Sequence, residues 1–211
     1  MRKIAVLIAM IAFPALLFAQ EPEQGAKPEH EKDAVNTESV DRAAYTAAVN
    51  YTTVDKHALS LSSKYKTIPA LAKDLFEPLS TQQEKVRAIF MWITNNISYD
   101  CVAYHSKKST RVSFSYSTEQ ELAEKKEKYY FEYATRVLQS RKAVCEGYAA
   151  LFNALCKQAG IQSEVVIGTA SNNIEKIKRL KERKNFFTNH TWTKVLIDGN
   201  GHYADPTGAA A

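Results

Sequence analysis

A cysteine, a histidine and an aspartate in this sequence have the types and the order that thiol nucleophile chemistry needs. Cys145 opens a predicted helix, where free backbone N–H groups and the positive end of the helix dipole favour thiolate over thiol. His190 begins a segment with strand character, and Asp205 lies in the next one. In such a set the imidazole takes the proton of the thiol and the carboxylate orients the imidazole. We therefore predict that Cys145, His190 and Asp205 form a catalytic triad.

The helix that must carry Cys145 has an apolar stripe along one face. From Tyr148 onward, apolar side chains recur at steps of three and four residues. They are Leu151, Phe152, Leu155, Cys156 and Ala159. Gly160 then supplies a stop signal. We expect this helix to pack on the core through the stripe, with Cys156 as a small buried apolar residue.

The histidine and the aspartate are predicted to lie on a hairpin. Residues 190–197 alternate and contain β-branched side chains, which is typical of a strand. The turn-forming residues 198–201 follow, and a second short strand is predicted at 202–206. A hairpin of this length brings His190 and Asp205 side by side on one face.

Two further segments belong to this part of the chain. Residues 162–168 alternate poorly, which predicts a first core strand that is buried on both faces. Residues 171–188 form an insert rich in Lys, Arg and Glu before the histidine. The insert either covers a cleft or is a plain surface excursion.

The order and the local sequence of these residues resemble the transglutaminase-like superfamily, and within it the kyphoscoliosis-peptidase-like branch. The similar segments are 85–100, 143–149, 161–168, 190–192, 197–199 and 203–207. The resemblance covers roughly residues 55 to 207. It implies an α+β fold with a papain-like core, in which the Cys helix packs on an antiparallel sheet that bears His and Asp. A helical N-terminal region would precede this core.

The resemblance also implies a function. The expected reaction is acyl transfer from a peptide or amide carbonyl through a thioester on Cys145, as in a cysteine peptidase or amidase. An amine acceptor instead of water would make the protein a cross-linking transglutaminase. A binding or scaffolding module that keeps the fold without turnover is the third alternative. The expected partner is a protein or peptide substrate, and the backbone N–H of Cys145 is one expected oxyanion donor.

The N-terminal segment predicts export. Residues 1–19 have a basic start and an apolar run too short for a convincing membrane span, which is typical of a secretory signal peptide. Residues 20–40 are polar and predict a flexible tether. The domain is then expected at 41–211, with a helical lead-in at 41–140 and a catalytic core at 141–207. We expect a periplasmic or extracellular protein without stable membrane insertion; an uncleaved anchor is the alternative.

Charge and cysteine content restrict the remaining function classes. The formal net charge of +5 falls to +3 without Arg2 and Lys3, and no aromatic-basic groove motif accompanies it. We therefore expect no nucleic-acid partner. No two cysteines have zinc-ligand spacing, so we expect no metal site and no cofactor. A disulfide between Cys101 and Cys156 would leave Cys145 free, and the alternative is three free thiols.

Capping signals predict two helices in the lead-in. The pattern Thr81-Gln82-Gln83-Glu84 starts an apolar-periodic helix that ends near Asn96, with Trp92 in the core. The same pattern at Thr118 starts a helix that continues to Leu138 beside the Cys145 helix. Arg136 and Arg141 then lie near the site, either as surface charges or as substrate contacts.

The rest of the lead-in gives weaker signals. Residues 41–74 have a weak helical pattern that Pro69 is expected to break. Residues 101–117 are polar and predict a long loop at the mouth of the cleft. The histidines other than His190 lack a chemical context and are expected in solvent or turns. They are His30, His57, His105 and His202.

Overall fold

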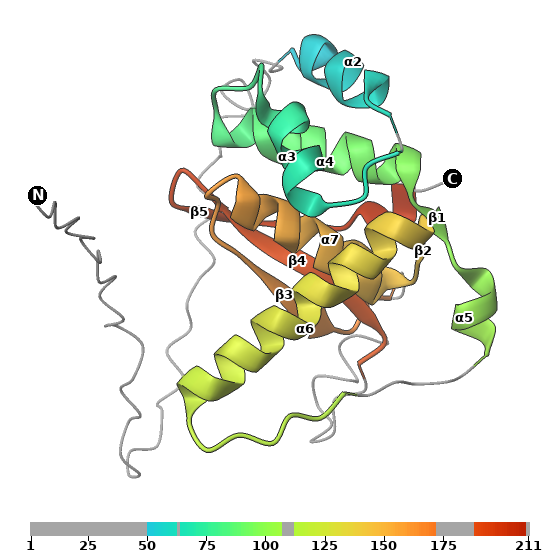
Figure 1. The fold of residues 1–211 in the computed structure, drawn as a ribbon, viewed down its shortest axis with the longest axis vertical. Helices are drawn as coiled ribbons and strands as arrows, with labels where there is room; N and C mark the ends of the chain where they lie inside the picture. Colours follow the sequence, from blue (N-terminus) through green and yellow to red (C-terminus); the bar gives the residue numbers. More distant parts are fainter. Residues whose placement is uncertain (1–49, 63, 107–111, 172–187, 210–211) are drawn as a thin grey trace, which may run out of the picture. The chain divides into compact units, whose positions relative to one another are not determined.

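Helix α7, Cys145–Gln158, is the element on which the others pack (Figure 1). This computed structural model describes residues 50–62, 64–106, 112–171 and 188–209. One side of α7 lies on a three-stranded sheet, and helices of the lead-in cover its other sides. Residues 147–156 are all buried, because neighbours surround the helix beyond the apolar stripe that the sequence predicts.

The sheet is antiparallel and has the strand order β3-β4-β5. Its strands are β3 (Ser163–Gly168), β4 (His190–Ile197) and β5 (Asn200–Ala204). Gly168 pairs with His190, and Thr193 pairs with Ala204. The predicted α+β class, with a Cys-bearing helix on an antiparallel sheet, is therefore confirmed.

The predicted bounds of the hairpin were wrong by a few residues. Asp198 and Gly199 both have positive φ, 50° and 82°, so two residues complete the turn. Such a turn matches the twist of the flanking strands, and pairing resumes at Asn200. As a result, β5 already ends at Ala204, and Asp205 follows the strand instead of lying within it.

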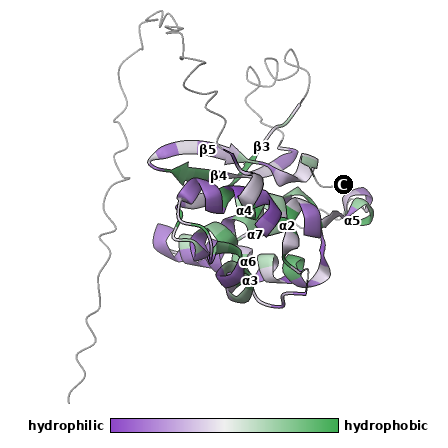
Figure 2. Ribbon diagram, turned by 90° about the horizontal axis from the view of Figure 1, so that it is seen from above, coloured by the Kyte–Doolittle hydropathy of each residue, from purple (hydrophilic) through white to green (hydrophobic). Residues whose placement is uncertain are grey.

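Strand β3 is not buried on both faces, which corrects that prediction. None of its residues is fully buried: Glu164 and Ile167 are exposed, Ile167 by 56%, and the other four are half-buried. The reason is that β3 lies at an edge of the sheet and α7 covers only one face. The hydropathy colours show a strongly apolar end of the central strand β4 beside a mostly polar β5 (Figure 2).

The two helices predicted from capping signals are present. Helix α4, Gln82–Asn96, starts with a capping box in which Thr81 and Glu84 bond each other's backbone N–H. Helix α6, Glu119–Ser140, starts at a Thr118 cap and packs along α7. Both predictions are confirmed, and Trp92 is fully buried as expected.

Other parts of the lead-in differ from the prediction. The weak pattern contains two helices, α2 (Thr52–Ser60) and α3 (Ile68–Phe76). Pro69 lies in the first turn of α3, where its missing N–H costs nothing, so it starts a helix and does not break one. The predicted loop after residue 100 begins with a short helix, α5 (Cys101–His105), because Asp100 caps it.

A small parallel sheet joins the lead-in to α7. It pairs β1 (Ser98–Tyr99) with β2 (Lys142–Ala143). Strand β1 directly follows α4, and β2 directly precedes α7. These two-residue strands carry no periodic signal, so the sequence did not predict them.

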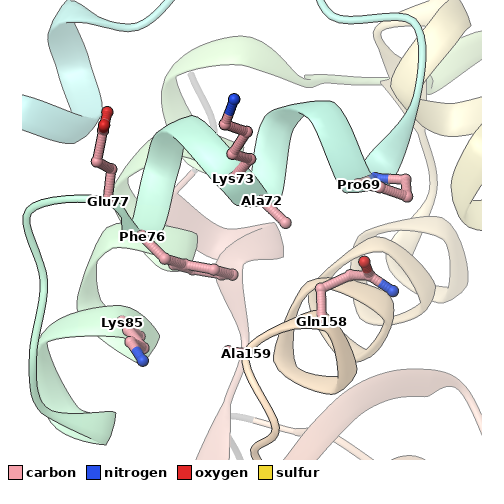
Figure 3. Close-up of a pocket in the computed structure, with 8 residues that line it drawn as sticks. All are labelled: Pro69, Ala72, Lys73, Phe76, Glu77, Lys85, Gln158 and Ala159. Carbon is pink, nitrogen blue, oxygen red and sulfur yellow. The ribbon is translucent and has the colours of Figure 1, made fainter.

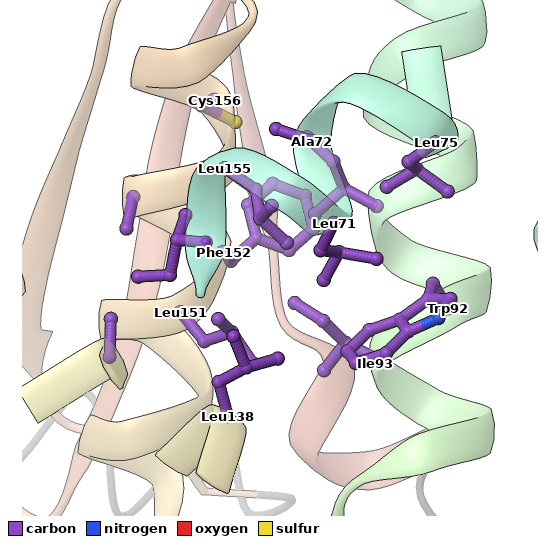
Figure 4. Packing of buried hydrophobic residues seen from close by; sticks show 14 of the residues in the cluster. Leu71, Ala72, Leu75, Trp92, Ile93, Leu138, Leu151, Phe152, Leu155 and Cys156 are labelled. Atoms are coloured by element: carbon purple, nitrogen blue, oxygen red, sulfur yellow. The ribbon is translucent and has the colours of Figure 1, made fainter. Parts of the chain in front are cut away.

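The core lies between α7 and the lead-in helices (Figure 4). Leu151, Phe152 and Leu155 of α7 face α3 and α4. The opposing side chains are Leu71, Ala72, Leu75, Trp92 and Ile93, with Leu138 from α6. Cys156 is fully buried in this cluster, which confirms its predicted place.

The predicted signal peptide (1–19), the tether (20–40) and most of the insert (171–188) lie outside the described residues. Within the described residues, no helix has the length and apolar character to cross a membrane.

Candidate active site

Cys145 lies at the first position of α7, as the sequence predicted. The residue before it, Val144, has an extended backbone and no side-chain cap for the helix. The N–H groups of the first turn therefore keep their positive field for an anion at this point. Cys145 is free and partly exposed, so the thiol is open to a reagent or substrate.

The packing of α7 on β4 brings Cys145 to the end of the sheet where His190 lies. The Thr193 hydroxyl donates to the carbonyl of Ala149 at 3.1 Å. Ser163, which pairs with Val195 of β4, donates to the side chain of Asn153 in α7, so α7 and β4 run in the same direction. Four helical residues back from Ala149 span about 6 Å. Two strand residues back from Thr193 span about 7 Å. Cys145 is therefore level with Thr191, the neighbour of His190.

His190 and Asp205 form a hydrogen-bonded pair. The His190 Nε2 atom lies 2.6 Å from Asp205 Oδ2, and the Thr207 N–H donates to Oδ1 at 3.1 Å. The His190 side chain is 19% exposed and that of Asp205 is 41% exposed. An ionised carboxylate only accepts, so Nε2 is the donor in this pair. In the neutral ring Nδ1 then keeps its lone pair and is the basic atom.

The strand β4 carries both the histidine of this pair and the face that packs on α7. Thr191, Thr193 and Val195 form the buried face of β4 that packs on α7, and at the start of the strand the His190 ring lies 5.7 Å from the Trp192 ring, measured between centroids. In the described part of the chain, no hydrogen bond joins Cys145 to His190. Catalytic hydrogen bonds are often long or open before substrate is bound.

Tyrosines of α6 and one glutamate lie beside the start of α7, and the sequence analysis did not predict them. Burial raises the pKa of Glu146, and its carboxylate lies 3.5 Å from the Tyr129 hydroxyl. Burial, followed by the charge of Glu146, raises the pKa of Tyr130 and Tyr133 to about 12. Tyr130 and Tyr133 therefore keep their phenol protons at every physiological pH.

Gly147 permits the close approach of α6 to this turn. A Cβ atom at this position would lie 2.7 Å from the Ala143 Cβ and 2.9 Å from Val137 Cγ2. Since α6 and β2 both touch the helix here, no larger residue fits without movement of the backbone.

Neither arginine beside the site is a free surface charge. Arg141 donates to the carbonyl of Tyr65 at 3.0 Å and lies 5.1 Å from the Trp92 ring centroid. Arg136 lies 5.4 Å from the ring centroid of Tyr133. Burial lowers the pKa of Arg141, which is consistent with a structural place between α4 and the connection from α2 to α3.

The other histidines lie away from the pair. His57 is not in solvent as predicted: its Nε2 lies 3.1 Å from the carbonyl of Asp74 and ties α2 to α3. His105 and His202 are exposed, in agreement with the prediction, and His30 lies outside the described residues.

Cys101 is exposed, Cys156 is buried, and all three cysteines are free, so the structure does not contain the Cys101–Cys156 disulfide. Among the residues that the structure describes, no group of three or more His, Cys, Asp or Glu side chains is placed to hold a metal ion.

A pocket of about 420 Å³ lies at the opposite end of α7 from Cys145 (Figure 3). The Phe76 ring extends from α3 toward Gln158 and Ala159, and Lys85 of α4 closes one side. Because the length of α7 separates this pocket from Cys145, it is not part of the candidate site.

Comparison with protein-family models finds a match that spans most of the described chain. A model described as the transglutaminase-like superfamily matches residues 69–204. The matched range includes Cys145 and His190 and ends one residue before Asp205.

Individual relatives match a similar length of the chain. Kyphoscoliosis peptidase from Homo sapiens is 30% identical over 139 residues, which are 65% of this chain and 17% of the relative. The same protein from Mus musculus gives the same identity and coverage. The chain thus spans 17% of the length of these curated relatives. Among solved structures, the periplasmic domain of TgpA from Pseudomonas aeruginosa matches with a TM-score of 0.43 and 16% identity, covering 75% of this chain and 48% of that one.

Proposed function

The chain belongs to the transglutaminase-like superfamily, and from this premise we propose that it is a thiol enzyme that transfers acyl groups through a thioester on Cys145. The predicted superfamily and kyphoscoliosis-peptidase-like branch are both confirmed. The proposed reaction is hydrolysis of a peptide or amide bond, as in a cysteine peptidase or amidase. The observation that carries the proposal is the 2.6 Å pair of His190 and Asp205 at the end of the sheet where α7 begins.

Each residue of the proposed triad has a defined role. His190 Nδ1 takes the thiol proton while Nε2–H stays bonded to Asp205, which stabilises the imidazolium that forms. The Cys145 sulfur then bonds to the carbonyl carbon, and the carbonyl electron pair moves to oxygen. When that pair returns, the C–N bond breaks and the amine leaves with the proton from His190. Water then gives a proton to His190 and bonds to the thioester carbonyl carbon, the C–S bond breaks, and the acid leaves while the Cys145 sulfur takes back the proton.

The molecule that accepts the acyl group from the thioester decides between hydrolysis and cross-linking. A primary amine in place of water would give a new amide bond, and the protein would be a cross-linking transglutaminase. Both reactions share the thioester and differ only in the second half. Product analysis with and without an added primary amine separates them.

An inactive binding module is the second candidate. It is favoured by one observation: in the described part of the chain, no hydrogen bond joins the thiol to the imidazole. In such a module the thiol would react no faster than that of an ordinary exposed cysteine. Alkylation of Cys145 followed against pH, with the exposed Cys101 as internal reference, measures this difference.

Three substitutions test the triad with an electrophilic peptide probe and intact-mass detection. We expect Cys145→Ala to abolish labelling, because the nucleophile is gone. His190→Ala should reduce it nearly as much, whereas Asp205→Ala should leave more residual activity. Cys101→Ser is the matched control, since it removes an exposed thiol that is not a member of the proposed triad. Labelling that persists in Cys145→Ala, or is unchanged in His190→Ala, refutes the assignment.

We also propose that residues 1–19 direct export and are removed near Ala19. A basic start followed by an apolar run supports this proposal. N-terminal sequencing of the protein from envelope and culture fractions should find a new terminus near residue 20. A cytoplasmic protein that still begins at Met1 contradicts it.

A further inference from the structure

Strand β1 places Tyr99 beside the nucleophile although 46 positions separate them in the sequence. Tyr99 pairs with Ala143 in the parallel β1–β2 sheet, and Ala143 is two residues before Cys145. The Asp100 N–H donates to the carbonyl of Ala143 at 2.9 Å and fixes this register. Side chains of paired residues share one face of a sheet. Tyr99 therefore lies on the face where Ala143 packs on the first turn of α7.

The Tyr99 ring is held by its neighbours. It stacks on the ring of Tyr148, one turn along α7 from Cys145, with centroids 6.4 Å apart and an angle of 21°. Tyr148 is itself fixed, because its hydroxyl donates to the carbonyl of Ile97 at 2.7 Å. Tyr104 contacts Tyr99 from α5, with the centroids 5.9 Å apart.

The Tyr99 hydroxyl is free to donate a hydrogen bond. In the part of the chain that the structure describes, this hydroxyl has no hydrogen-bond partner. Burial raises the pKa of Tyr99, and the charge of the Cys145 thiolate raises it further. The pairing of Tyr99 with Ala143 and the stack on Tyr148 place the phenol at the end of α7 where Cys145 lies. The phenol thus stays protonated while the thiolate forms.

We propose that the Tyr99 hydroxyl is the second oxyanion donor of this site, together with the backbone N–H of Cys145. The inference rests on the proposed thioester chemistry and adds a residue to it. When sulfur bonds to the carbonyl carbon, the C=O electron pair moves to oxygen, and the two donors bind that oxygen. The pair returns to carbon–oxygen bonding when the amine leaves, so Tyr99 keeps its proton throughout. Donors of this kind act on the charge that develops in the transition state.

The test compares two reactions of the same thiol in wild type and Tyr99→Phe. A peptide aldehyde adds to the thiol and forms a tetrahedral adduct whose oxygen occupies the oxyanion position. Iodoacetamide alkylates the thiol by displacement and forms no such oxygen. Tyr99→Phe keeps the ring that stacks on Tyr148 and removes only the hydroxyl. Tyr104→Phe removes a neighbouring phenol hydroxyl on α5 and is the matched control.

We expect Tyr99→Phe to weaken aldehyde binding by about a hundredfold, the size seen when one oxyanion donor is removed. Its iodoacetamide rate and its thermal transition should stay within about twofold and a few degrees of wild type. Tyr104→Phe should leave both reactions unchanged.

Three results overturn parts of the scheme and are distinguishable. Unchanged aldehyde binding in Tyr99→Phe overturns the role of Tyr99 alone. Equal loss of both reactions with a native thermal transition assigns Tyr99 to the thiol and not to the oxyanion. A wild-type Cys145 that reacts with iodoacetamide but never with the aldehyde refutes the proposed function itself.

Discussion

Glu146 directly follows the proposed nucleophile in α7. Burial raises the pKa of its carboxyl group, so folding disfavours its ionised form. Its protonated form is favoured in the folded chain, so its contribution to stability is full below the unfolded pKa. That contribution is lost as the pH rises through the folded pKa. Glu146→Gln is uncharged at every pH, and its stability relative to wild type should therefore increase as the pH rises above 4.5, the ordinary pKa of a glutamate.

Urea unfolding of wild type and Glu146→Gln at several pH values between 4 and 8 measures this difference. Glu132→Gln is the control. Glu132 lies on helix α6, which packs against α7 at this site, but its side chain is exposed. A stability difference for Glu146→Gln that does not change with pH would contradict the explanation.

At the scale of residues, the sequence predicted that His190 and Asp205 lie side by side, but it did not predict what lies around Cys145. His190 and Asp205 could be paired in advance because a short hairpin joins them. Tyr99 and Glu146 could not be assigned, because their places depend on the parallel β1–β2 pairing and on burial by α6. Neither effect leaves a periodic pattern in the sequence.

At the scale of elements, one buried hydrogen bond ties the nucleophile helix to the histidine strand. The Thr193 hydroxyl is fully buried and donates to the carbonyl of Ala149 at 3.1 Å. Thr193→Val keeps the shape and loses this bond, so we expect a loss of about 1 kcal/mol in the free energy of unfolding. Because α7 then shifts more easily on β4, reaction of Cys145 with the electrophilic probe should also slow.

Thr191→Val is the matched control for this prediction. Thr191 lies on the same buried face of β4 and has no side-chain hydrogen bond in the described part of the chain. Its replacement should change stability by less than about 0.5 kcal/mol and leave labelling unchanged. If both valine variants behave alike in denaturant unfolding and in labelling, Thr193 does not have the role assigned to it.

Elements with a strong local signal were predicted and others were not. The capping signals of α4 and α6 correctly gave two long helices. Pro69 was misread as a break, because a proline in the first turn of a helix and one inside it look alike without the helix start. The prediction that β3 is buried on both faces was wrong, because the sequence does not show which strand lies at the edge of the sheet.

At the scale of the whole molecule, the fold divides the three thiols into accessible and inaccessible ones. Burial raises the pKa of the Cys156 thiol to about 12, and its side chain has no exposed surface. We expect a mild alkylating reagent to modify Cys101 and Cys145 in the native protein and Cys156 only after unfolding. Peptide mass mapping before and after denaturation measures this order. Native labelling of Cys156 at the rate of Cys101 would contradict the packing of α7.

The fold class was predictable because the segments around Cys145, His190 and Asp205 resemble one family in their order and local sequence, and the family match confirms it. What could not be predicted is how closely the thiol approaches the imidazole. That distance depends on the face of β4 from which His190 projects and on the angle between α7 and the sheet.

The thioester on Cys145 is the central claim, and intact-mass analysis of the protein mixed with an activated peptide ester tests it most directly. The predicted result is a rapid mass gain equal to one acyl group, mapped to the peptide that contains Cys145. Hydroxylamine should remove it, and it should be absent from Cys145→Ala. No mass gain in wild type, or an equal gain in Cys145→Ala, would contradict the proposed function.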